Sequence, residues 1–242
     1  MKLVTWNLNG LEDEHLDVRT EAAMFQILLG APIEEAMVEG FKPNAPDIVL
    51  LQEVVERTFH AHVKPHLQAA GFTLYPDAPT ERSYFEVIAV RQTILESSYA
   101  SFEYSEQGRG LSTITIDDLT IMTAHMESMK PGKSMRIDQA RSILEQMNQC
   151  DTPCIFGGDT NLRKDEWETL NPDNIIDAWQ TSGSPKKHRT TWEQHPYKSR
   201  YGRVWMQGLN IKSFETFGTK QVTGIQQRPS DHLGIRVVFD NL

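Results

Sequence analysis

The stretch Pro153-Cys154-Ile155-Phe156-Gly157-Gly158-Asp159-Thr160-Asn161 changes from apolar to polar within a few residues. Its apolar half predicts a short buried strand. Asp159 then follows directly where that strand should end. A carboxylate beside a core is costly to bury unless it binds a cation or is hydrogen-bonded. Asp159 is therefore a candidate functional residue, and the rest of the chain can be searched for the same pattern.

Four more apolar runs also end in polar side chains. One such residue alone is more often a solvated loop residue, but five strand ends of this kind are not accidental. If the five strands lie side by side, their polar ends converge on one pocket. The polar residues that follow the other four runs are Asn7 and Asn9 after Trp6, Gln52-Glu53 after Leu51, His125 to Ser128 after Thr123, and Ser230-Asp231-His232 after Pro229.

Short apolar runs outnumber helical segments, and several follow one another without a helix between them. Asp117-Asp118, for example, separates two such runs and predicts a hairpin turn. This order favours two packed β-sheets with helices outside over a doubly wound parallel sheet. We predict strands at Lys2–Trp6, Asp47–Leu51, Glu86–Val90, Ser112–Ile116, Leu119–Thr123, Pro153–Phe156, Arg203–Trp205 and Gly234–Phe239, helices at Val18–Leu29, Val54–Ala70 and Met135–Met147, and an irregular, helix-containing insertion at Gly30–Asn44.

The length of 242 residues predicts one large layered domain over residues 1–242. The 39% apolar and 24% charged residues are ordinary values, which exclude a disordered, collagen-like or coiled-coil chain. No apolar run is long enough to span a bilayer, and the N-terminus lacks a signal-peptide pattern. Together with only two cysteines, this predicts an intracellular monomer without membrane contact, cytoplasmic or, in a eukaryote, nuclear.

The charge is unevenly distributed along the chain. The net charge of −9 argues against a general nucleic-acid coat protein. Residues 1–60 contain eleven acidic and four basic side chains, whereas residues 183–203 contain six basic side chains and one acidic one. Such a distribution suits an enzyme that holds a cation and binds a phosphate. The alternative interpretation is a solvated basic loop.

The residue types at the strand ends suggest a reaction. The sequence contains no nucleophile elbow, no P-loop and no HExxH motif. Glu53 together with Asn and Asp oxygens is a hard donor set that suits Mg²⁺ with several retained waters. Asp159 would polarise a water that Asn161 orients, and His232 would stabilise charge at a phosphorus centre. The predicted chemistry is metal-assisted hydrolysis of a phosphodiester.

The same motifs, in this order, resemble the Mg²⁺-dependent endonuclease/exonuclease/phosphatase superfamily. Within it, the chain is most similar to the 5′-tyrosyl-DNA phosphodiesterase (type 2) branch, which removes tyrosine from 5′ DNA ends. The resemblance implies a four-layer α/β sandwich of two packed, mostly antiparallel sheets flanked by helices. It rests on Thr5-Trp6-Asn7-Leu8-Asn9-Gly10-Leu11, Leu51-Gln52-Glu53-Val54, His125-Met126-Glu127-Ser128, Asp159-Thr160-Asn161-Leu162-Arg163, Thr191-Trp192 and Ser230-Asp231-His232.

The resemblance also implies a role for each matching residue. Glu53 is expected to be the principal metal ligand, with Asn7 and Asp231 near the metal, which would be Mg²⁺ with Mn²⁺ as a substitute. Asp159 and Asn161 position the water, and His232 stabilises the developing charge. The residues expected to contact the substrate, a single-stranded or frayed 5′ DNA end, are His125, Ser128, Arg163 and Trp192, with Arg200 and Arg203 in the basic segment.

One position departs from the family pattern. The family usually has Arg-Phe-Asp-Arg-Ile, where this chain has Arg200-Tyr201-Gly202-Arg203-Val204. The aspartate that orients the catalytic histidine therefore corresponds to Gly202 here. A carboxylate partner fixes an imidazole and raises its pKa. Its absence predicts a less constrained His232 and a slower enzyme, unless another carboxylate compensates or the motif aligns one residue away.

Several other functions stay open at this stage. An abasic-site endonuclease is the nearest rival, although that branch has Gln-Glu-Thr-Lys where this chain has Gln52-Glu53-Val54-Val55. A lipid phosphatase or sphingomyelinase-like enzyme would need membrane-docking apolar loops, and none is evident. A 3′ exonuclease or deadenylase also fits the motifs. A catalytically weak nucleic-acid-binding protein of the same fold is the alternative from another class, and Gly202 is its only support.

Overall fold

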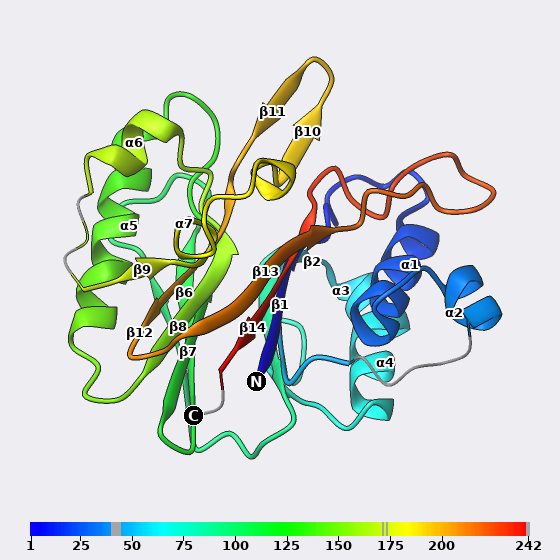
Figure 1. The fold of residues 1–242 in the computed structure, drawn as a ribbon, viewed down its shortest axis with the longest axis horizontal. Helices are drawn as coiled ribbons and strands as arrows, with labels where there is room; N and C mark the ends of the chain where they lie inside the picture. The colour runs from blue at the N-terminus through cyan, green and yellow to red at the C-terminus, as the bar shows by residue number, and fades with distance from the viewer. Residues whose placement is uncertain (40–44, 171, 173, 241–242) are drawn as a thin grey trace.

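Two six-stranded β-sheets pack face to face in the centre of the molecule (Figure 1). The computed structural model describes residues 1–39, 45–170, 172 and 174–240. The first sheet has the order β13-β14-β1-β2-β4-β3. Its strands are β1 (Lys2–Asn7), β2 (Ile48–Val54), β3 (Thr73–Tyr75), β4 (Phe85–Val90), β13 (Ile211–Phe217) and β14 (Gly234–Phe239).

The second sheet has the order β5-β6-β7-β8-β12-β9. A separate two-stranded hairpin projects from the sandwich near its upper edge in Figure 1. The strands of the second sheet are β5 (Glu96–Ser101), β6 (Gly110–Ile116), β7 (Leu119–Ala124), β8 (Cys154–Asp159), β9 (Ile176–Asp177) and β12 (Gly202–Gln207), and the hairpin consists of β10 (Trp192–Gln194) and β11 (Tyr197–Ser199).

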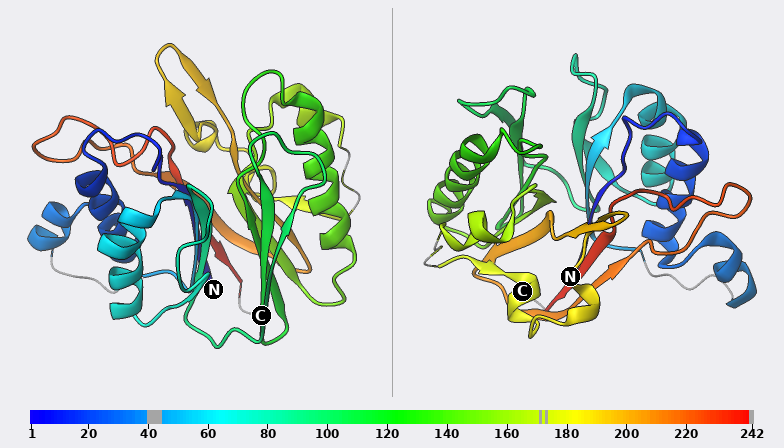
Figure 2. Two further views of the ribbon diagram at one scale, coloured as in Figure 1. Left: turned by 180° about the vertical axis from the view of Figure 1, so that it is seen from behind. Right: turned by 90° about the horizontal axis from the view of Figure 1, so that it is seen from above.

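Helices cover the outer face of each sheet (Figure 2). Those that follow β1 and β2 lie on the first sheet, and those on either side of β8 lie on the second. None of the helices in the described residues is long and apolar enough to cross a membrane. The helical elements are α1 (Leu16–Leu29), α2 (Ile33–Glu39), α3 (Glu56–Thr58), the π-helix η1 (Phe59–Val63), α4 (Lys64–Ala69), α5 (Lys133–Asn148), α6 (Lys164–Glu168), α7 (Ala178–Thr181) and the 3₁₀-helix η2 (Lys186–His188).

The core lies in three layers because the inner strands are apolar on both faces. Leu3 and Leu50 point into the interface between the sheets, where they join Ile155 of the second sheet. Their neighbours Val4 and Leu51 point outward, against α1, η1 and α4. This alternation is what the period of two in a β-strand requires. The predicted four-layer α/β sandwich, with two mostly antiparallel sheets between helices, is confirmed.

The predicted elements of the interior are present, with shifted ends. The helix expected at Val54–Ala70 begins only at Glu56, because Val54 still belongs to β2, and it contains a π-helical turn. Residues 33–39 of the insertion at Gly30–Asn44 form α2, and residues 40–44 lie outside the described residues. The strands missing from the prediction are β3, β5, β9, β10, β11 and β13, which lie at sheet edges or in the hairpin. Edge strands such as β5 are exposed and lack an apolar run.

The topology brings the polar strand ends together. β1 pairs with β2 in parallel, and β7 pairs with β8 in parallel. Parallel neighbours end at the same edge of a sheet, so the carboxyl ends of these four central strands emerge side by side. β14 is antiparallel to β1, and its first residues therefore begin at this edge as well. All five polar clusters lie at one edge of the sandwich.

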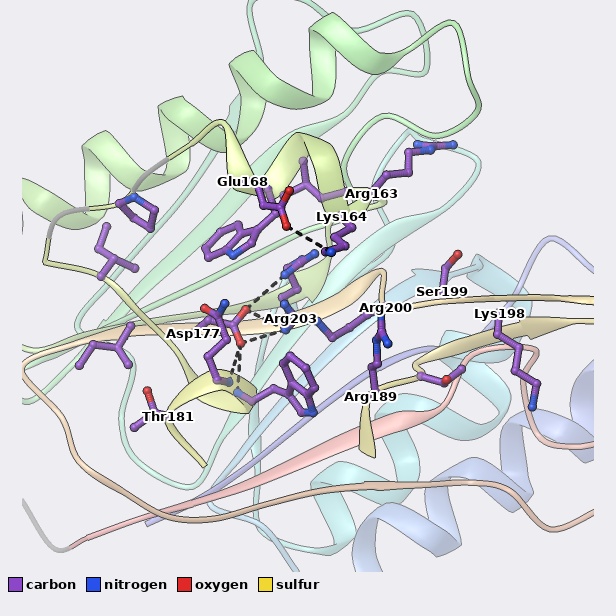
Figure 3. A pocket seen from close by; sticks show the side chains of 18 residues that line it. Arg163, Lys164, Glu168, Asp177, Thr181, Arg189, Lys198, Ser199, Arg200 and Arg203 are labelled. Carbon is purple, nitrogen blue, oxygen red and sulfur yellow. Dashed lines mark hydrogen bonds and ion pairs between the residues drawn. The ribbon is translucent and has the colours of Figure 1, made fainter. Parts of the chain in front are cut away.

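A cavity of about 1050 Å³ lies beside this edge (Figure 3). Its walls come from α6, from β9 and α7, and from the segment that joins the hairpin to β12. Its lining residues include Arg163, Trp167, Asp177, Trp179 and Arg200. Arg163, which follows the polar cluster at the end of β8, is part of this lining, so the cavity adjoins the edge where the five polar clusters lie.

We predict that Arg136→Met destabilises the fold by about 3–5 kcal/mol, because it leaves a buried carboxylate unpaired. Arg136 and Glu166 are almost completely buried and form a two-pronged ion pair at 3.1 and 2.7 Å. Arg136 also donates to the carbonyls of residues 127–129. Urea denaturation would measure the loss. Arg141→Met, which breaks an exposed pair on the same helix, is the control and should change stability little; equal effects would contradict the prediction.

Candidate active site

Five polar side chains from five different strand ends meet at this edge. Asn7 and Asp159 are the last residues of β1 and β8, and Glu53 is the last residue but one of β2. His125 directly follows β7, and His232 lies two residues before β14. All five are residues that the sequence singled out. The two sheets thus contribute opposite walls of one site.

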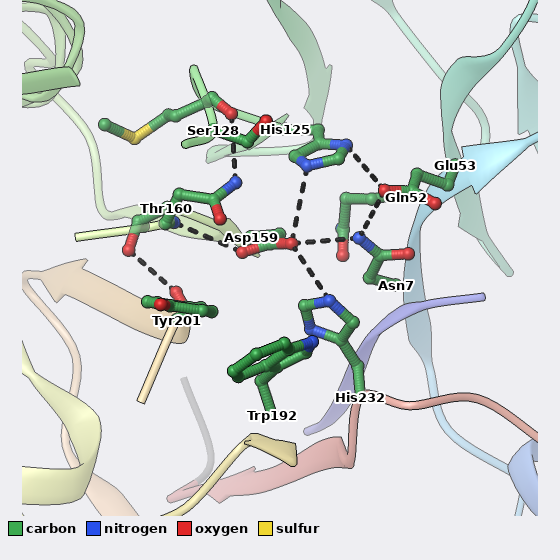
Figure 4. Close-up of polar contacts among 12 residues, drawn as sticks. Asn7, Gln52, Glu53, His125, Ser128, Asp159, Thr160, Trp192, Tyr201 and His232 are labelled. Atoms are coloured by element: carbon green, nitrogen blue, oxygen red, sulfur yellow. Dashed lines mark hydrogen bonds and ion pairs between the residues drawn. The ribbon is translucent and has the colours of Figure 1, made fainter. Parts of the chain in front are cut away.

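Asp159 is the centre of the hydrogen-bond network (Figure 4). Its Oδ2 accepts a hydrogen bond from Asn7 Nδ2 at 2.9 Å and lies 3.5 Å from Nε2 of both His125 and His232. Asn7 Nδ2 also donates to Glu53 Oε1 at 3.2 Å. Asn7 therefore links the carboxylate of one sheet to the carboxylate of the other. Its own oxygen accepts from the backbone N–H of Asn9 at 2.9 Å, which fixes the orientation of the amide.

The backbone at Glu53 is in the left-handed region, with φ of 53°. This conformation is costly for a residue with a side chain and often marks a functional position. The pairing of β2 with β4 shifts between Leu51 and Val54, so Glu53 lies in a bulge that turns its side chain into the site. Gly10 packs against this bulge, and a Cβ there would lie 2.0 Å from the Glu53 carbonyl oxygen. Only glycine fits at position 10, because the Glu53 carbonyl lies too close for any side chain.

Burial changes the protonation behaviour of the site. It raises the pKa of the Glu53 carboxyl above its ordinary value. Burial opposes ionisation of Asp159 too, but the neighbouring His232 and His125 imidazoles and the Asn7 amide lower the pKa of Asp159 below its ordinary value. For His125, burial lowers the pKa to about 3, so its imidazole is neutral at pH 7. The site thus contains an ionised aspartate beside a neutral histidine.

His232 is held by the backbone of its own loop. Its N–H donates to Ser230 Oγ at 3.0 Å, and Ser230 Oγ donates to the Asn7 carbonyl at 2.7 Å. Asp231 faces the other way and accepts from Trp192 Nε1 at 2.8 Å. Its Oδ1 is 3.9 Å from His232 Nε2. The Ser-Asp-His motif therefore connects β1, the hairpin and the Asp159 carboxylate.

Asn161, which was predicted to position the water, and two predicted substrate residues, Ser128 and Arg163, lie around this cluster. Asn161 has φ of 52°, and its amide donates to the Met126 carbonyl at 3.1 Å, so it ties β8 to the loop after β7. Ser128 lies in that loop and donates to Gln107 at 2.9 Å. Arg163 lies at the start of α6, with its guanidinium 5.7 Å from the ring centroid of Tyr201. The Asn161 N–H also donates to Asp159 Oδ1 at 3.2 Å, so Asn161 contacts the centre, whereas Ser128 and Arg163 line the approaches.

Two predicted substrate residues, Arg200 and Arg203, do not join the cluster. Their guanidinium groups turn to Asp177, at 2.8 and 3.3 Å, and line the neighbouring cavity. Register explains the position of Arg203, because Gly202 pairs with Asp159 and the next residue of a strand points to the opposite face. The basic segment is thus divided between the site and the cavity.

Three residues without a predicted role also support the site. Gln107 accepts both the N–H and the hydroxyl of Ser128, and the Tyr84 ring lies 6.1 Å from the His125 ring. Gln52, which was noted only as part of a motif, donates to Thr5 and Thr123 and so joins the two sheets beneath Glu53. Gln107 and Tyr84 belong to no strand-end motif, so no signal in the sequence could have found them.

The oxygen atoms of the site fit a hard divalent cation. Burial disfavours the charge of Glu53, and a cation would compensate for it. Asp231 Oδ1 is buried and has no hydrogen-bond partner in the described part of the chain. Over the same residues, no group of three His, Cys, Asp or Glu side chains could hold a metal ion. Mg²⁺ does not require such a group, since it is often held by one or two carboxylates, water and phosphate oxygens.

The model of the Endonuclease/Exonuclease/phosphatase family matches residues 4–232. Curated relatives include tyrosyl-DNA phosphodiesterase 2 from Mus musculus, with 27% identity over 97% of this chain, and the 5′-tyrosyl-DNA phosphodiesterase of Caenorhabditis briggsae, with 26% identity over 99%. The chain spans 65% and 69% of the length of these two relatives, just under two thirds in the first case.

Solved structures agree with this fold. TDP2 from C. elegans superimposes with a TM-score of 0.82 and 25% identity, covering 99% of this chain and 75% of that one. D. rerio TDP2 complexed with single strand DNA product has a TM-score of 0.81 and 24% identity, covering 100% and 99%. At these identities the structures establish the common architecture, and the chemistry must come from the residues of the site.

Proposed function

Because the chain belongs to the endonuclease/exonuclease/phosphatase family, we propose that it is a metal-dependent phosphodiesterase that releases tyrosine or related adducts from 5′ DNA ends. The observation that carries the proposal is the convergence of five strand ends on Asp159, with Oδ2 within 3.5 Å of three nitrogen atoms and linked through Asn7 to Glu53. The similarity to tyrosyl-DNA phosphodiesterases along nearly the whole chain supports the choice of substrate.

Glu53 is the proposed principal ligand of Mg²⁺, with Mn²⁺ as a substitute. Asp231 would hold the waters around the metal, and the amide of Asn7 would orient Glu53. When bound, the metal offsets the negative charge that builds up on the phosphate oxygens. Carboxylate and water oxygens are the ligands that Mg²⁺ prefers.

In the proposed reaction, residues of this chain take a proton from the attacking water and stabilise the negative charge on the phosphate oxygens. Asp159, ionised and held by Asn7, accepts a proton from the attacking water as the water oxygen bonds to phosphorus. The bond between phosphorus and the tyrosyl oxygen breaks in line, which gives a 5′-phosphate and a tyrosyl phenolate; solvent protonates the phenolate to tyrosine and takes up the proton held by Asp159. The imidazoles of His232 and the neutral His125 lie on either side of Asp159, where they would donate to the non-bridging phosphate oxygens.

The aromatic wall beside the centre suits a single-stranded or frayed end. The rings of Trp192 and Tyr201 lie 5.3 Å apart, and Arg163 lies beside Tyr201. Aromatic rings that stack on bases, with a nearby cation, bind single strands without reading their sequence. Ser128, in the loop after β7, would hold a phosphate oxygen from the opposite side. We propose that one copy of the chain is sufficient for the reaction.

A cleavage assay tests the proposed function. It would compare a 5′-phosphotyrosyl oligonucleotide, an abasic-site duplex and a small phosphodiester, each with Mg²⁺ and with EDTA. We expect metal-dependent release of tyrosine to exceed the other two reactions. Preferential abasic cleavage would move the substrate to another branch of the family. No metal-dependent reaction on any of the three would contradict the enzyme assignment.

We predict that Gly202→Asp leaves the rate unchanged or raises it. The position faces β14, which follows His232, and the residue before Trp192, which bridges to His232: a Cβ there would lie 3.2 Å from Ile235 and 3.4 Å from Thr191. A carboxylate at this place would restore the partner that the family has for the histidine. Steady-state rates would be compared with those of Gly202→Ala, which adds the same Cβ without charge. A large loss with aspartate alone would show that His232 relies on another geometry.

A further inference from the structure

The cavity beside the active site has an excess of positive charge. Its lining contains two acidic residues, Glu168 and Asp177, and six basic ones. Glu168 is 3.6 Å from Lys164 at the rim, and Lys198 is paired outside the cavity with Glu193. The basic residues of the lining are Arg163, Lys164, Arg189, Lys198, Arg200 and Arg203.

Two guanidinium groups share one carboxylate at the base of the cavity. Arg200 donates to both oxygens of Asp177 at 2.9 and 2.8 Å, and Arg203 donates to one of them at 3.3 Å. Asp177 also caps α7 by accepting the N–H groups of residues 179 and 180. Arg200 and the two N–H groups of α7 therefore already stabilise most of the negative charge of Asp177 without Arg203.

Arg203 remains only partly satisfied although it is buried. Its side chain is 2% exposed, and its Nε has no hydrogen-bond partner in the described residues. Burial, followed by the nearby charge of Arg200, lowers the pKa of Arg203 to about 9. Its counter-charge, Asp177, is shared with Arg200, and a buried donor without an acceptor is costly. Arg163 and Arg189 also line the cavity; Arg163 donates to a backbone carbonyl, that of Asn161, and Arg189 is exposed at the rim.

The cavity is continuous with the catalytic segment of the chain. Arg163 donates to the carbonyl of Asn161 at 3.0 Å, so the residue that lines the cavity is anchored two residues beyond Asp159. On the other side, Arg200 and Tyr201 directly precede Gly202, which is the pairing partner of Asp159. The rim of the cavity therefore reaches the segments that carry Asp159 and its pairing partner, by way of Arg163 and the Tyr201 ring.

We propose that this cavity is a second phosphate-binding site, in which Arg189, Arg200 and Arg203 receive a phosphate group separate from the one that is hydrolysed. A phosphodiester of the same DNA strand is the source that the position of the cavity favours, and this part of the inference rests on the proposed function. Guanidinium groups suit phosphate because they present several donors in one plane. Free inorganic phosphate has the same chemistry and is distinguished by the test below.

The test measures binding and not cleavage, so that it does not depend on the proposed reaction. Fluorescent single-stranded oligonucleotides of increasing length, with a 5′-phosphate, would be titrated with the protein in EDTA and followed by anisotropy at several salt concentrations. The variants are Arg189→Gln at the exposed rim and Arg200→Gln at the base. The matched control is Arg141→Gln, which removes one exposed charge from α5 and has its own partner in Asp138.

We expect Arg189→Gln to weaken binding of the longer strands by about three- to tenfold and to reduce the salt slope by about 0.7, as loss of one phosphate contact requires. The shortest strands and the Arg141→Gln control should change little. If Arg200→Gln does not fold, Arg189→Gln alone decides the result. Equal effects of Arg189→Gln and Arg141→Gln, or an equal effect at every strand length, would overturn the strand as the ligand.

Inorganic phosphate separates the two sources. Competition by phosphate against long strands, weakened by Arg189→Gln, would support a phosphate site that the strand occupies. In the other outcome, inorganic phosphate binds in a way that depends on Arg189, but oligonucleotide affinity does not change with strand length. That result would support a phosphate site and would overturn the DNA strand as its ligand. If Arg189→Gln loses affinity for long strands and still releases tyrosine normally from a short substrate, the cavity and the catalytic centre act separately.

Discussion

Asp159→Asn is expected to lower turnover by about two to four orders of magnitude, the range typical of a lost proton acceptor. The amide can still accept from Asn7, so the geometry around it should survive. It cannot take a proton from water, however, and it carries no charge to attract His232. His232→Ala should fall in the same range, because it removes a donor placed 3.5 Å from Asp159 Oδ2.

Single-turnover rates with a 5′-phosphotyrosyl oligonucleotide would measure this loss without interference from product release. Asp165→Asn is a matched control, since it makes the same change on an exposed position of α6 and should retain the wild-type rate. Circular dichroism would establish that Asp159→Asn is folded. A rate within a few-fold of wild type for either active-site variant would remove that residue from its assigned role.

Glu53→Ala is expected to lower metal-dependent turnover by about three orders of magnitude or more, because a metal contributes several kcal/mol to charge stabilisation at phosphorus. Glu53 lies in a bulge with a strained backbone, and its carboxyl is linked through Asn7 to Asp159. The two neighbouring carboxylates each have one oxygen engaged elsewhere: Asp231 Oδ2 accepts from Trp192 and Asp159 Oδ2 accepts from Asn7. The loss should appear in the rate at saturating substrate.

The measurement is the initial rate of tyrosine release over a range of Mg²⁺ concentrations. Glu56→Ala is the control, three residues further on at the exposed start of α3. Recovery of the Glu53→Ala variant at high Mg²⁺ would assign Glu53 to metal affinity alone. If the same variant kept the wild-type rate and EDTA still abolished it, the metal would have to be held elsewhere.

Much of the fold could be predicted because the inner strands are buried on both faces. Lys2–Trp6 and Pro153–Phe156 consist mostly of apolar residues in direct succession, and a strand between two packed layers requires that pattern. The turn at Asp117-Asp118 could be predicted because these two residues separate two apolar runs. Asp117 has the positive φ of a tight turn. Edge strands such as β5 and β13 were not predicted. Their side chains are largely exposed, so polar residues are tolerated there and the sequence shows no apolar run.

The members of the active site were also readable from the sequence, since polar residues directly after apolar strands must have a reason to be there. Asn7, Glu53, His125, Asp159 and His232 could be named, but not that one oxygen of Asp159 would be shared among three of them. That arrangement depends on parallel pairing of β1 with β2 and of β7 with β8, which connects residues far apart along the chain.

Only the tertiary structure decided what the basic segment does. The sequence by itself determined that residues 183–203 are basic, and it could not show that Arg200 and Arg203 turn to Asp177 whereas Trp192 turns to Asp231. Local pattern specifies which side chains are polar and which strands are buried. The register between β8 and β12 specifies which face each side chain occupies, and that register is set by contacts between distant parts of the chain.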